Sequence, residues 1–485
     1  MYIDGKWSLA SDGGTRELRN PANGEVVATV AEGTRDDAQR AIASAQEAFH
    51  AGAWGKTNAA DRSRLLLRLA DKIEEHATEF AHIETLNAGK PLRETDFDVA
   101  DAAGCFRYYA GLANKPQGQT FDVSAPSQTL VVREPIGVCA QIIPWNYPLL
   151  MAAWKLAPGL AAGNACVLKP AELTPLTALR LAMLFDELEF PHGAVQIVLG
   201  AGPVVGAALA ESHLVDKIAF TGGTVTGRSI MHAATGNLKK ISLELGGKSP
   251  NVVFADADFD TAIDYALFGI YANAGQVCSA GSRLLIEDSL HDAFVARLIE
   301  RAQKIRVGDG FDPQTEMGPL VSRAHQEKVE RYIQAGIDEG ATLACGGKRL
   351  AGSLGERGNF ILPTIFTDTT PKMRIVQEEI FGPVLVVQKF KDEPEAVFMA
   401  NDTIYGLAGA VFTNDIAKAH RVIKKMRAGI TWINTYHPTY NEAPWGGYKQ
   451  SGIGRELGTY GYEAYTEVKQ INVNLDVVPS GWFSP

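Results

Sequence analysis

The feature that most constrains this chain is the alternation of strand-like and helical stretches after residue 137. Strands and helices in succession are typical of βαβ units, whose strands form a parallel sheet covered by the helices. We expect strands at 138–144, 165–168, 195–199, 217–220 and 251–254, with helices such as 175–188 between them. The sequence therefore predicts an α/β fold with a doubly wound, Rossmann-like sheet.

A second set of alternating elements follows the first. It comprises an expected helix at 259–271, strand at 283–286, helix at 290–305 and strand at 384–390. The chain has 485 residues, and single hydrophobic cores stop growing at roughly 250–300 residues. Two doubly wound α/β domains are therefore predicted.

Two extended segments lie outside these sets. Residues 118–133 and 464–475 carry short alternating patterns that favour strands over helix. The two segments can pair into a small outlying sheet. Contact with another subunit and a simple extension of a sheet edge are both open as its role.

The N-terminal region predicts helices of the scaffold. Residues 34–50 form the first, with Thr34 as its N-cap and acidic residues in the first turn. A longer helical region begins near Asp61, and Gly89 with Pro91 ends it. We expect no chemistry in either region.

Composition excludes several classes of function. The net charge is −10 and no basic run occurs, so no nucleic-acid partner is expected. The apolar stretch 149–168 is interrupted by Lys155, Pro158 and Asn164 and does not predict a membrane span. The five cysteines are too scattered for a disulfide framework or a zinc site, and no metal is expected. The first six residues lack the apolar core of a signal peptide, which favours a cytoplasmic location.

One cysteine, Cys278, follows the expected helix 259–271 after a short stretch of small residues. Taken alone it is expected to be a buried, inert thiol, because free cysteine is among the most buried residue types. A phosphate-type glycine loop, an amide donor and a glutamate in apolar surroundings occur elsewhere in the chain. These groups make chemical sense around a nucleophile, so Cys278 becomes the candidate for that role.

Two glycine loops each follow an expected strand and open a helix. Residues 200–206 resemble G-x-G-x-x-G but are one residue too long, and residues 220–227 contain Gly222, Gly223 and Gly227. A helix start of this kind presents free N–H groups to a phosphate. Dinucleotide binding and tight strand-to-helix turns are both consistent with the glycines alone.

Lys169 and Glu172 stand at the end of an expected strand, where open parallel sheets bind ligands. Both side chains can hydrogen-bond ribose hydroxyls, and the carboxylate repels a 2′-phosphate, which favours NAD over NADP. The alternative is a solvated ion pair at a helix start.

Asn146 and Glu244 are the remaining polar candidates. Asn146 follows an expected strand, and an asparagine amide can stabilise an oxyanion by roughly 3–4 kcal/mol. Glu244 is flanked by leucines and glycines, so its pKa is expected to be raised and to suit a general base. A ribose-binding acid is its competing role.

Six motifs resemble the aldehyde dehydrogenase superfamily and occur in that family's order over nearly the whole chain. They are P-W-N at 144–146, K-P-A-E at 169–172, F-T-G at 220–222, E-L-G-G-K-S-P at 244–250, G-Q-x-C at 275–278 and E-E-I-F-G-P at 378–383.

The resemblance implies a role for each matching residue. Cys278 is the nucleophile, Glu244 the base, and Asn146 with the Cys278 backbone N–H the oxyanion hole. NAD is the implied cofactor, with Lys169 and Glu172 on the adenosine ribose and Glu379 and Phe381 on the nicotinamide ribose and ring. The other cofactor contacts are expected at Trp145, Thr221, Gly222, Gly223, Gly227 and Leu245.

The resemblance also implies the domain plan. An NAD-binding domain spans 1–115 and 137–247, a catalytic domain spans 248–450, and an oligomerisation arm with the C-terminal segment takes 116–136 and 451–485. Members of the family usually assemble as dimers or tetramers, so a homo-oligomer, either a dimer or a homotetramer, is expected.

The implied reaction is oxidation of an aldehyde to an acid through a thiohemiacetal and a thioester on Cys278. Relatives that pass the acyl group to coenzyme A commonly lack the glutamate. Glu244 therefore favours hydrolysis and a free acid product.

Three aromatic residues, Tyr147, Trp154 and Trp445, are the substrate candidates. Aromatic faces attract quaternary ammonium groups by about 2 kcal/mol when desolvated, although a plain aromatic tunnel is equally compatible. The C-S-A-G-S-R run at 278–283 and Trp445 resemble betaine aldehyde dehydrogenases within the family. Betaine aldehyde, oxidised to glycine betaine, is the expected substrate. The alternatives are 4-aminobutyraldehyde or 4-trimethylaminobutyraldehyde, and a retired enzyme that serves as a binding or structural protein.

Overall fold

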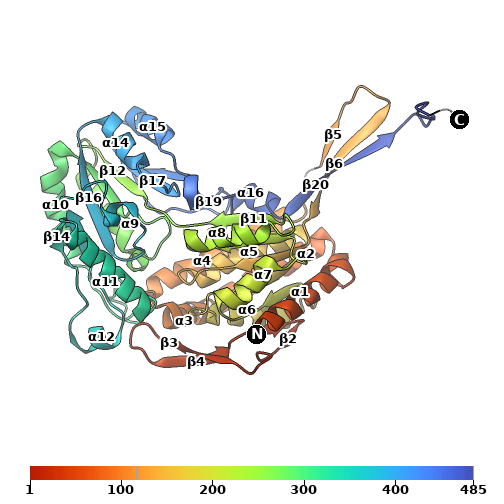
Figure 1. Cartoon of the computed structure of the whole chain (residues 1–485), viewed down its shortest axis with the longest axis horizontal. Coiled ribbons are helices and arrows are strands. Elements are labelled where there is room, and N and C mark those ends of the chain that lie inside the picture. The colour runs from red at the N-terminus through yellow and green to blue at the C-terminus, as the bar shows by residue number, and fades with distance from the viewer. Residues whose placement is uncertain (116–117, 484–485) are drawn as a thin grey trace.

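The computed structural model describes residues 1–115 and 118–483 (Figure 1). Residues 116 and 117 of the predicted arm, and residues 484 and 485 of the predicted C-terminal segment, lie outside the described residues. The chain forms two sheets flanked by helices and a separate arm that projects from the body beside the C-terminal end (Figure 1). The predicted α/β class with a small β arm is confirmed.

The first sheet has eight strands, with five parallel strands at its centre and antiparallel strands at both edges. In spatial order the strands are β19 (Gly452–Ile453), β11 (Lys240–Glu244), β10 (Lys217–Thr221), β7 (Val138–Ile142), β8 (Ala165–Lys169), β9 (Val195–Ile197), β1 (Tyr2–Ile3) and β2 (Lys6–Trp7). The four strands expected in this region are present. Strand β11, which carries Glu244, was not expected.

Helices from the first half of the chain cover this sheet. They are α1 (Arg35–His50), α2 (Ala59–Glu75), α3 (Ala77–Ala88), α4 (Leu92–Leu112), α5 (Pro148–Ala162), α6 (Leu176–Glu187), α7 (Ala207–Glu211) and α8 (Thr224–Ala234), with α16 (Gly458–Glu463) packed on α5. Thr34 caps α1 as predicted, in a reciprocal capping box with Asp37. The long helical region expected after Asp61 is two helices divided at His76.

The second sheet has seven strands, all parallel except the edge strand β14. Its spatial order is β14 (Thr342–Cys345), β15 (Thr364–Thr367), β16 (Val384–Phe390), β13 (Arg283–Glu287), β12 (Pro250–Val253), β17 (Ala408–Phe412) and β18 (Ile430–Ile433). Its helices are α9 (Phe259–Tyr271), α10 (Asp288–Ala302), α11 (Arg323–Asp338), α12 (Gly352–Arg357), α13 (Arg374–Gln377), α14 (Glu393–Asn401) and α15 (Ile416–Lys425).

The arm is a three-stranded antiparallel sheet in the order β20 (Thr466–Asn474), β6 (Ser127–Pro135) and β5 (Gln119–Phe121). Strands β20 and β6 pair along their full length, from Thr466 opposite Pro135 to Asn474 opposite Ser127. The predicted pairing of these two distant segments is confirmed. A separate hairpin, β3 (Thr15–Arg19) with β4 (Val26–Ala31), lies near the N-terminus.

Within the part of the chain that the structure describes, no helix combines the length and the apolar character that a membrane crossing requires.

Candidate active site

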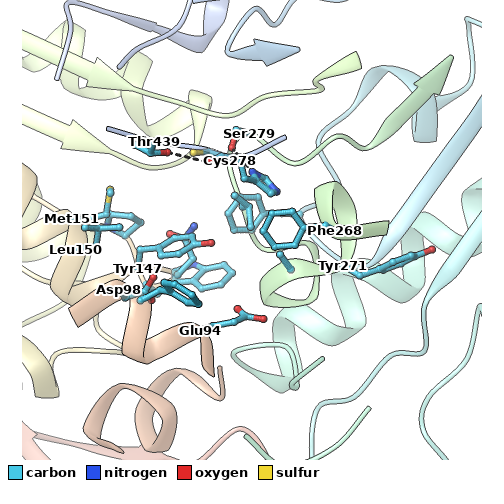
Figure 2. Close-up of a pocket in the computed structure, with 18 of the residues that line it drawn as sticks. Glu94, Asp98, Tyr147, Leu150, Met151, Phe268, Tyr271, Cys278, Ser279 and Thr439 are labelled. Atoms are coloured by element: carbon cyan, nitrogen blue, oxygen red, sulfur yellow. Dashed lines mark hydrogen bonds between the residues drawn. The ribbon is translucent and has the colours of Figure 1, made fainter. Parts of the chain in front are cut away.

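A cavity of about 1140 Å³ collects most of the chemically active residues singled out above. Its walls come from the carboxyl ends of β7, β10 and β11, from α4 and α5, and from the turn after α9. This is the edge at which parallel sheets bind ligands, because successive loops converge there. Figure 2 shows Cys278 and Ser279 on one side of the cavity and Glu94 and Asp98 on another.

Cys278 reaches the cavity through a left-handed turn. After α9 the chain forms the short 3₁₀ element η3 (Ala272–Gly275), in which Asn273, Ala274 and Gly275 have φ of 47°, 53° and 73°. Left-handed backbone costs roughly 1–2 kcal/mol for a residue with a Cβ. Gly275 is also required sterically, because a Cβ there would lie 2.1 Å from the Gly382 carbonyl oxygen. The small residues before the cysteine are therefore needed to form this turn.

The thiol of Cys278 holds its proton in the folded chain. Burial, followed by the neighbouring carboxylates Glu244 and Glu379, raises its pKa well above the usual value. A thiolate is the nucleophilic form, so a base must remove this proton when the substrate arrives.

Glu244 is the last residue of β11 and faces the same cavity. Its carboxylate oxygen Oε1 accepts a hydrogen bond of 3.2 Å from Nε1 of Trp445. Burial, followed by the charge of Glu456, raises the pKa of Glu244 to about 8. A carboxyl group with this pKa can accept a proton near neutral pH, which suits a general base.

Asn146 lies beside the turn at residues 272–275 that precedes the candidate nucleophile Cys278, called the nucleophile turn below. Its amide Nδ2 donates a 2.8 Å hydrogen bond to the carbonyl oxygen of Gln276, and its own carbonyl oxygen accepts one of 3.2 Å from Asn273 Nδ2. An asparagine amide carries two N–H groups. The second remains able to donate to an oxyanion formed next to Cys278.

Seven of the ten predicted cofactor residues line the cavity. They are Trp145, Thr221, Gly222, Gly223, Leu245, Glu379 and Phe381. Helix α8 begins directly after Gly223, which places the positive end of its dipole beside the cavity. The rings of Trp145 and Phe381 meet edge to face at 5.2 Å, and Gly247 N donates to Oε1 of Glu379 at 2.9 Å.

Lys169, Glu172 and Gly227 lie outside the cavity wall. Lys169 is buried, and its Nζ is 3.8 Å from Oε2 of Glu172. The other oxygen of Glu172 accepts a 2.6 Å hydrogen bond from the backbone of Gly202, which ties β8 to the first glycine loop. A Cβ on Gly227 would lie 2.6 Å from Cδ2 of Leu245, so this glycine lets α8 pack closely on the residue after β11.

Comparison with known proteins gives the family. The profile described as the aldehyde dehydrogenase family matches residues 7–471. The chain is 52% identical to a betaine aldehyde dehydrogenase of Bacillus subtilis, over all of this chain and 99% of that protein. It is 48% identical to an aldehyde dehydrogenase of Aspergillus niger, over 98% of this chain and 95% of that protein.

The chain belongs to the aldehyde dehydrogenase family.

The fold agrees with that membership. A crystal structure of a betaine aldehyde dehydrogenase from Staphylococcus aureus in complex with NAD⁺ superposes with a TM-score of 0.99 at 50% identity, over 100% of this chain and 96% of that one. The family predicted from the six motifs is confirmed.

All three predicted substrate aromatics of this aldehyde dehydrogenase line the cavity. Trp154 and Trp445 are buried and meet at a centroid distance of 5.6 Å. The ring of Tyr147 already carries a cation, because Nζ of Lys90 lies 3.6 Å from its centroid. One face of Tyr147 is therefore occupied by the protein's own ammonium group, which leaves the other face and the two tryptophans for a ligand.

Sequence analysis missed an ionisable cluster at the start of α4. Lys90 donates to Asp98, which lines the cavity together with Glu94, and the charges of Lys90 and Asp98 also act on Glu84. Burial raises the pKa values of all three carboxyl groups, that of Glu94 to about 7. Glu94 and Asp98 are four residues apart on a helix, and this spacing is the signal that could have placed them on one face.

Several apolar residues and one histidine of the wall were also not predicted as site residues. They are Leu150, Met151, Leu267, Phe268, Tyr271, Val277 and His437. Among the described residues, no group of three or more His, Cys, Asp or Glu side chains is arranged to hold a metal ion.

Proposed function

We propose that this aldehyde dehydrogenase uses NAD to oxidise betaine aldehyde to glycine betaine through a thioester on Cys278. The observation that carries the proposal is the meeting of a thiol, a raised-pKa carboxyl group, an amide donor and two tryptophans in one cavity. Close similarity to betaine aldehyde dehydrogenases over the whole chain supports it.

The cavity residues fit a dinucleotide. The start of α8 after Gly222 and Gly223 offers backbone N–H groups to a phosphate, and Glu379 presents an anionic acceptor for ribose hydroxyls. Trp145 and Phe381 form an aromatic edge at the same wall. Bound NAD supplies the hydride acceptor.

The protein's own groups then account for the chemistry. The thiol of Cys278 passes its proton to a water molecule, and the resulting thiolate Sγ attacks the aldehyde carbon, which forms a tetrahedral oxyanion. Nδ2 of Asn146 and the Cys278 backbone N–H stabilise that oxyanion by donating to it. Loss of hydride leaves a thioester on Sγ. Glu244 takes a proton from the water that hydrolyses the thioester, and the free acid leaves.

The aromatic wall favours a quaternary ammonium substrate. Such a cation has no N–H donor, so contact with aromatic faces is its main favourable interaction, and buried faces provide about 2 kcal/mol or more. Trp154 and Trp445 offer two such faces.

The second candidate is an aminoaldehyde dehydrogenase acting on 4-aminobutyraldehyde or its trimethylated form. The acidic residues Glu94 and Asp98 on the wall favour 4-aminobutyraldehyde in particular, because its primary ammonium group can donate hydrogen bonds to their oxygens. A retired enzyme is the third candidate, and the intact set of Cys278, Glu244 and Asn146 is against it.

A kinetic panel separates these candidates. Purified enzyme is assayed for NADH or NADPH formation with betaine aldehyde, both aminoaldehydes and hexanal. We expect the highest kcat/KM for betaine aldehyde with NAD. A kcat/KM for betaine aldehyde well below that for hexanal removes the substrate proposal, and absence of NADH with every aldehyde favours the retired enzyme.

We further propose the domain plan of 1–115 with 137–247 for NAD, 248–450 for catalysis, and 116–136 with 451–485 for the arm and C-terminal segment.

Homo-oligomers, dimers or tetramers, are proposed from the exposed apolar side chains of the arm, which include Ile471, Val473 and Leu475. A cytoplasmic location is proposed because all five cysteines are free, as is usual in reducing compartments.

A further inference from the structure

Three consecutive residues at the start of α4 make hydrogen bonds to the segment 273–316, which includes Cys278. Leu92 N donates to the carbonyl oxygen of Gly310 at 3.0 Å, and the guanidinium of Arg93 donates to that of Glu316 at 2.8 Å. Glu94 accepts hydrogen bonds from the backbone N–H of Asn273, with Oε2 at 3.0 Å and Oε1 at 3.2 Å. The start of α4, which covers the first sheet, is thereby attached to the part of the chain that carries the nucleophile.

The contact of Glu94 differs from the other two because it reaches the left-handed turn before Cys278. The turn bends away from α9 at Asn273, whose φ is 47°. Its N–H therefore needs a partner outside the helix, and the partner is the Glu94 carboxylate.

Asn273 transmits this contact to the reacting groups. Its side-chain Nδ2 donates to the carbonyl oxygens of Asn146 and Gln276, at 3.2 and 3.3 Å. Gln276 in turn accepts from the Asn146 amide and precedes Cys278 by two residues. One chain of hydrogen bonds thus runs from Glu94 through Asn273 to the oxyanion donor and the nucleophile turn.

We propose that Glu94 is a positioning residue, whose carboxylate fixes the Asn273 turn and thereby the placement of Cys278 and Asn146. The inference rests on the proposed function, because it takes Cys278 as the nucleophile. Figure 2 shows Glu94 at the wall of the cavity on a different side from Cys278, so its effect on the thiol passes through the turn.

The role requires an acceptor oxygen and does not require a charge. Burial raises the pKa of Glu94 to about 7, so protonated and ionised forms coexist near neutral pH, and each retains an oxygen that can accept from Asn273. The charges of Lys90, Asp98 and Arg93 also act on Glu94, while Lys90 donates to Asp98 and Arg93 donates to the Glu316 carbonyl oxygen. A glutamine at position 94 keeps the acceptor and removes the charge, whereas an alanine removes both.

The experiment compares Glu94→Ala, Glu94→Gln and the control Thr95→Val in the full-length enzyme. Thr95 is buried on the same helix, and its hydroxyl meets Thr85 and the Leu92 carbonyl, away from the nucleophile turn. The readout is the single-turnover rate constant of NADH formation with enzyme and NAD in excess over aldehyde, normalised to titrated Cys278 thiol. A purely structural loss lowers the active fraction and leaves this rate constant unchanged.

We expect Glu94→Ala to lower the rate constant about tenfold, which corresponds to about 1.4 kcal/mol of transition-state stabilisation. The KM for NAD of this variant should stay within about twofold of the parent value, because Glu94 contacts Asn273 and is not assigned to cofactor binding. Glu94→Gln and Thr95→Val are expected to stay within about twofold of the parent rate constant.

An unchanged rate constant in Glu94→Ala overturns the inference. A loss in Glu94→Gln equal to that in Glu94→Ala also overturns it, because the negative charge of Glu94, and not its acceptor oxygen, would then be required. A comparable loss in Thr95→Val overturns it as well, because helix integrity then explains the effect. An inactive parent enzyme contradicts the proposed function itself and is recognised before any variant is compared.

Discussion

Cys278 and Glu244 are neighbouring acids whose pKa values are both raised, in each case chiefly by burial. The pKa of Cys278 is raised first by burial and then by Glu244, and the pKa of Glu244 is about 8. Near neutral pH both groups are mainly protonated. The base needed to hydrolyse the thioester is therefore the minor form of Glu244, and activity is expected to depend on pH.

The raised pKa of Glu244 predicts how kcat depends on pH. Hydrolysis requires ionised Glu244, so kcat limited by this step should rise about tenfold per pH unit well below 8 and level off above it. The pH profile of steady-state NADH formation measures this. Glu244→Gln should lower kcat and flatten the profile while it retains a single turnover of NADH. A parent profile that is flat from pH 6 to 8 contradicts the assignment of Glu244.

Trp445 has two separable contacts, one with Glu244 through its N–H and one with Trp154 through its ring. Trp445→Phe removes the donor that lowers the pKa of Glu244, so the midpoint of the pH profile should move upward. Trp445→Ala also removes the aromatic face, and it should lower kcat/KM for betaine aldehyde about tenfold more than for hexanal. Equal losses on both aldehydes would reduce the ring to a packing role.

At the residue scale, the sequence predicted Cys278, Glu244 and Asn146 because motif order links each of them to one reaction. It did not predict the bond from Trp445 to Glu244, which joins residues 201 positions apart, or Lys90 on the ring of Tyr147. Those contacts depend on how distant loops converge. No local pattern in the chain encodes them.

At the scale of elements, the turn before Cys278 is tightly constrained by its left-handed backbone and by the Gly382 carbonyl oxygen. Gly275→Ala places a Cβ 2.1 Å from the Gly382 carbonyl oxygen at a φ of 73°, so it should destabilise the fold by several kcal/mol and abolish NADH formation. Ala274→Gly is the matched control. Position 274 is also left-handed, and glycine relieves roughly 1 kcal/mol of strain there.

Thermal unfolding and NADH assays on both variants check this prediction. The Gly275 variant should unfold at a clearly lower temperature, and the Ala274 variant should keep its activity with an equal or higher Tm. A Gly275 variant with parental stability and activity would mean that the turn is not required.

The elements that the sequence predicted well are those with strong local signals. Thr34 and Asp37 form a capping box that starts α1, and apolar runs mark β7 and β8. Strand β11 was missed because its first two residues, Lys240 and Ile241, are not fully buried and the run is short. Its position next to β10 depends on pairing within the sheet, which becomes evident only in the folded chain.

At the scale of the molecule, the exposed apolar side chains of the arm predict that copies of the chain assemble. Ile471, Val473 and Leu475 alternate along β20 and just beyond it and are exposed in the single chain, which favours an interface between copies. We predict that the double substitution Ile471→Glu and Val473→Glu lowers the mass measured by light scattering to a smaller assembly. An unchanged mass, or a monomeric parent, contradicts the proposed role of the arm.

The two sheets and the arm were predictable because strand–helix alternation and short extended patterns extend along the chain. The cavity was not, since its walls combine α4, α5, the turn after α9 and the loop that carries Trp445. None of these segments has a sequence pattern that by itself predicts a cavity wall. Their convergence between the two sheets creates the site.

Cys278 is expected to form the covalent intermediate. The most direct test is NADH formation from betaine aldehyde by Cys278→Ala, at enzyme concentrations that allow slow turnover to be measured. We predict a loss of about 10⁴-fold or more in kcat, because no other group near the aldehyde can form the thioester. A Cys278→Ala enzyme that oxidises betaine aldehyde at a rate close to the parent would show that Cys278 does not form the covalent intermediate.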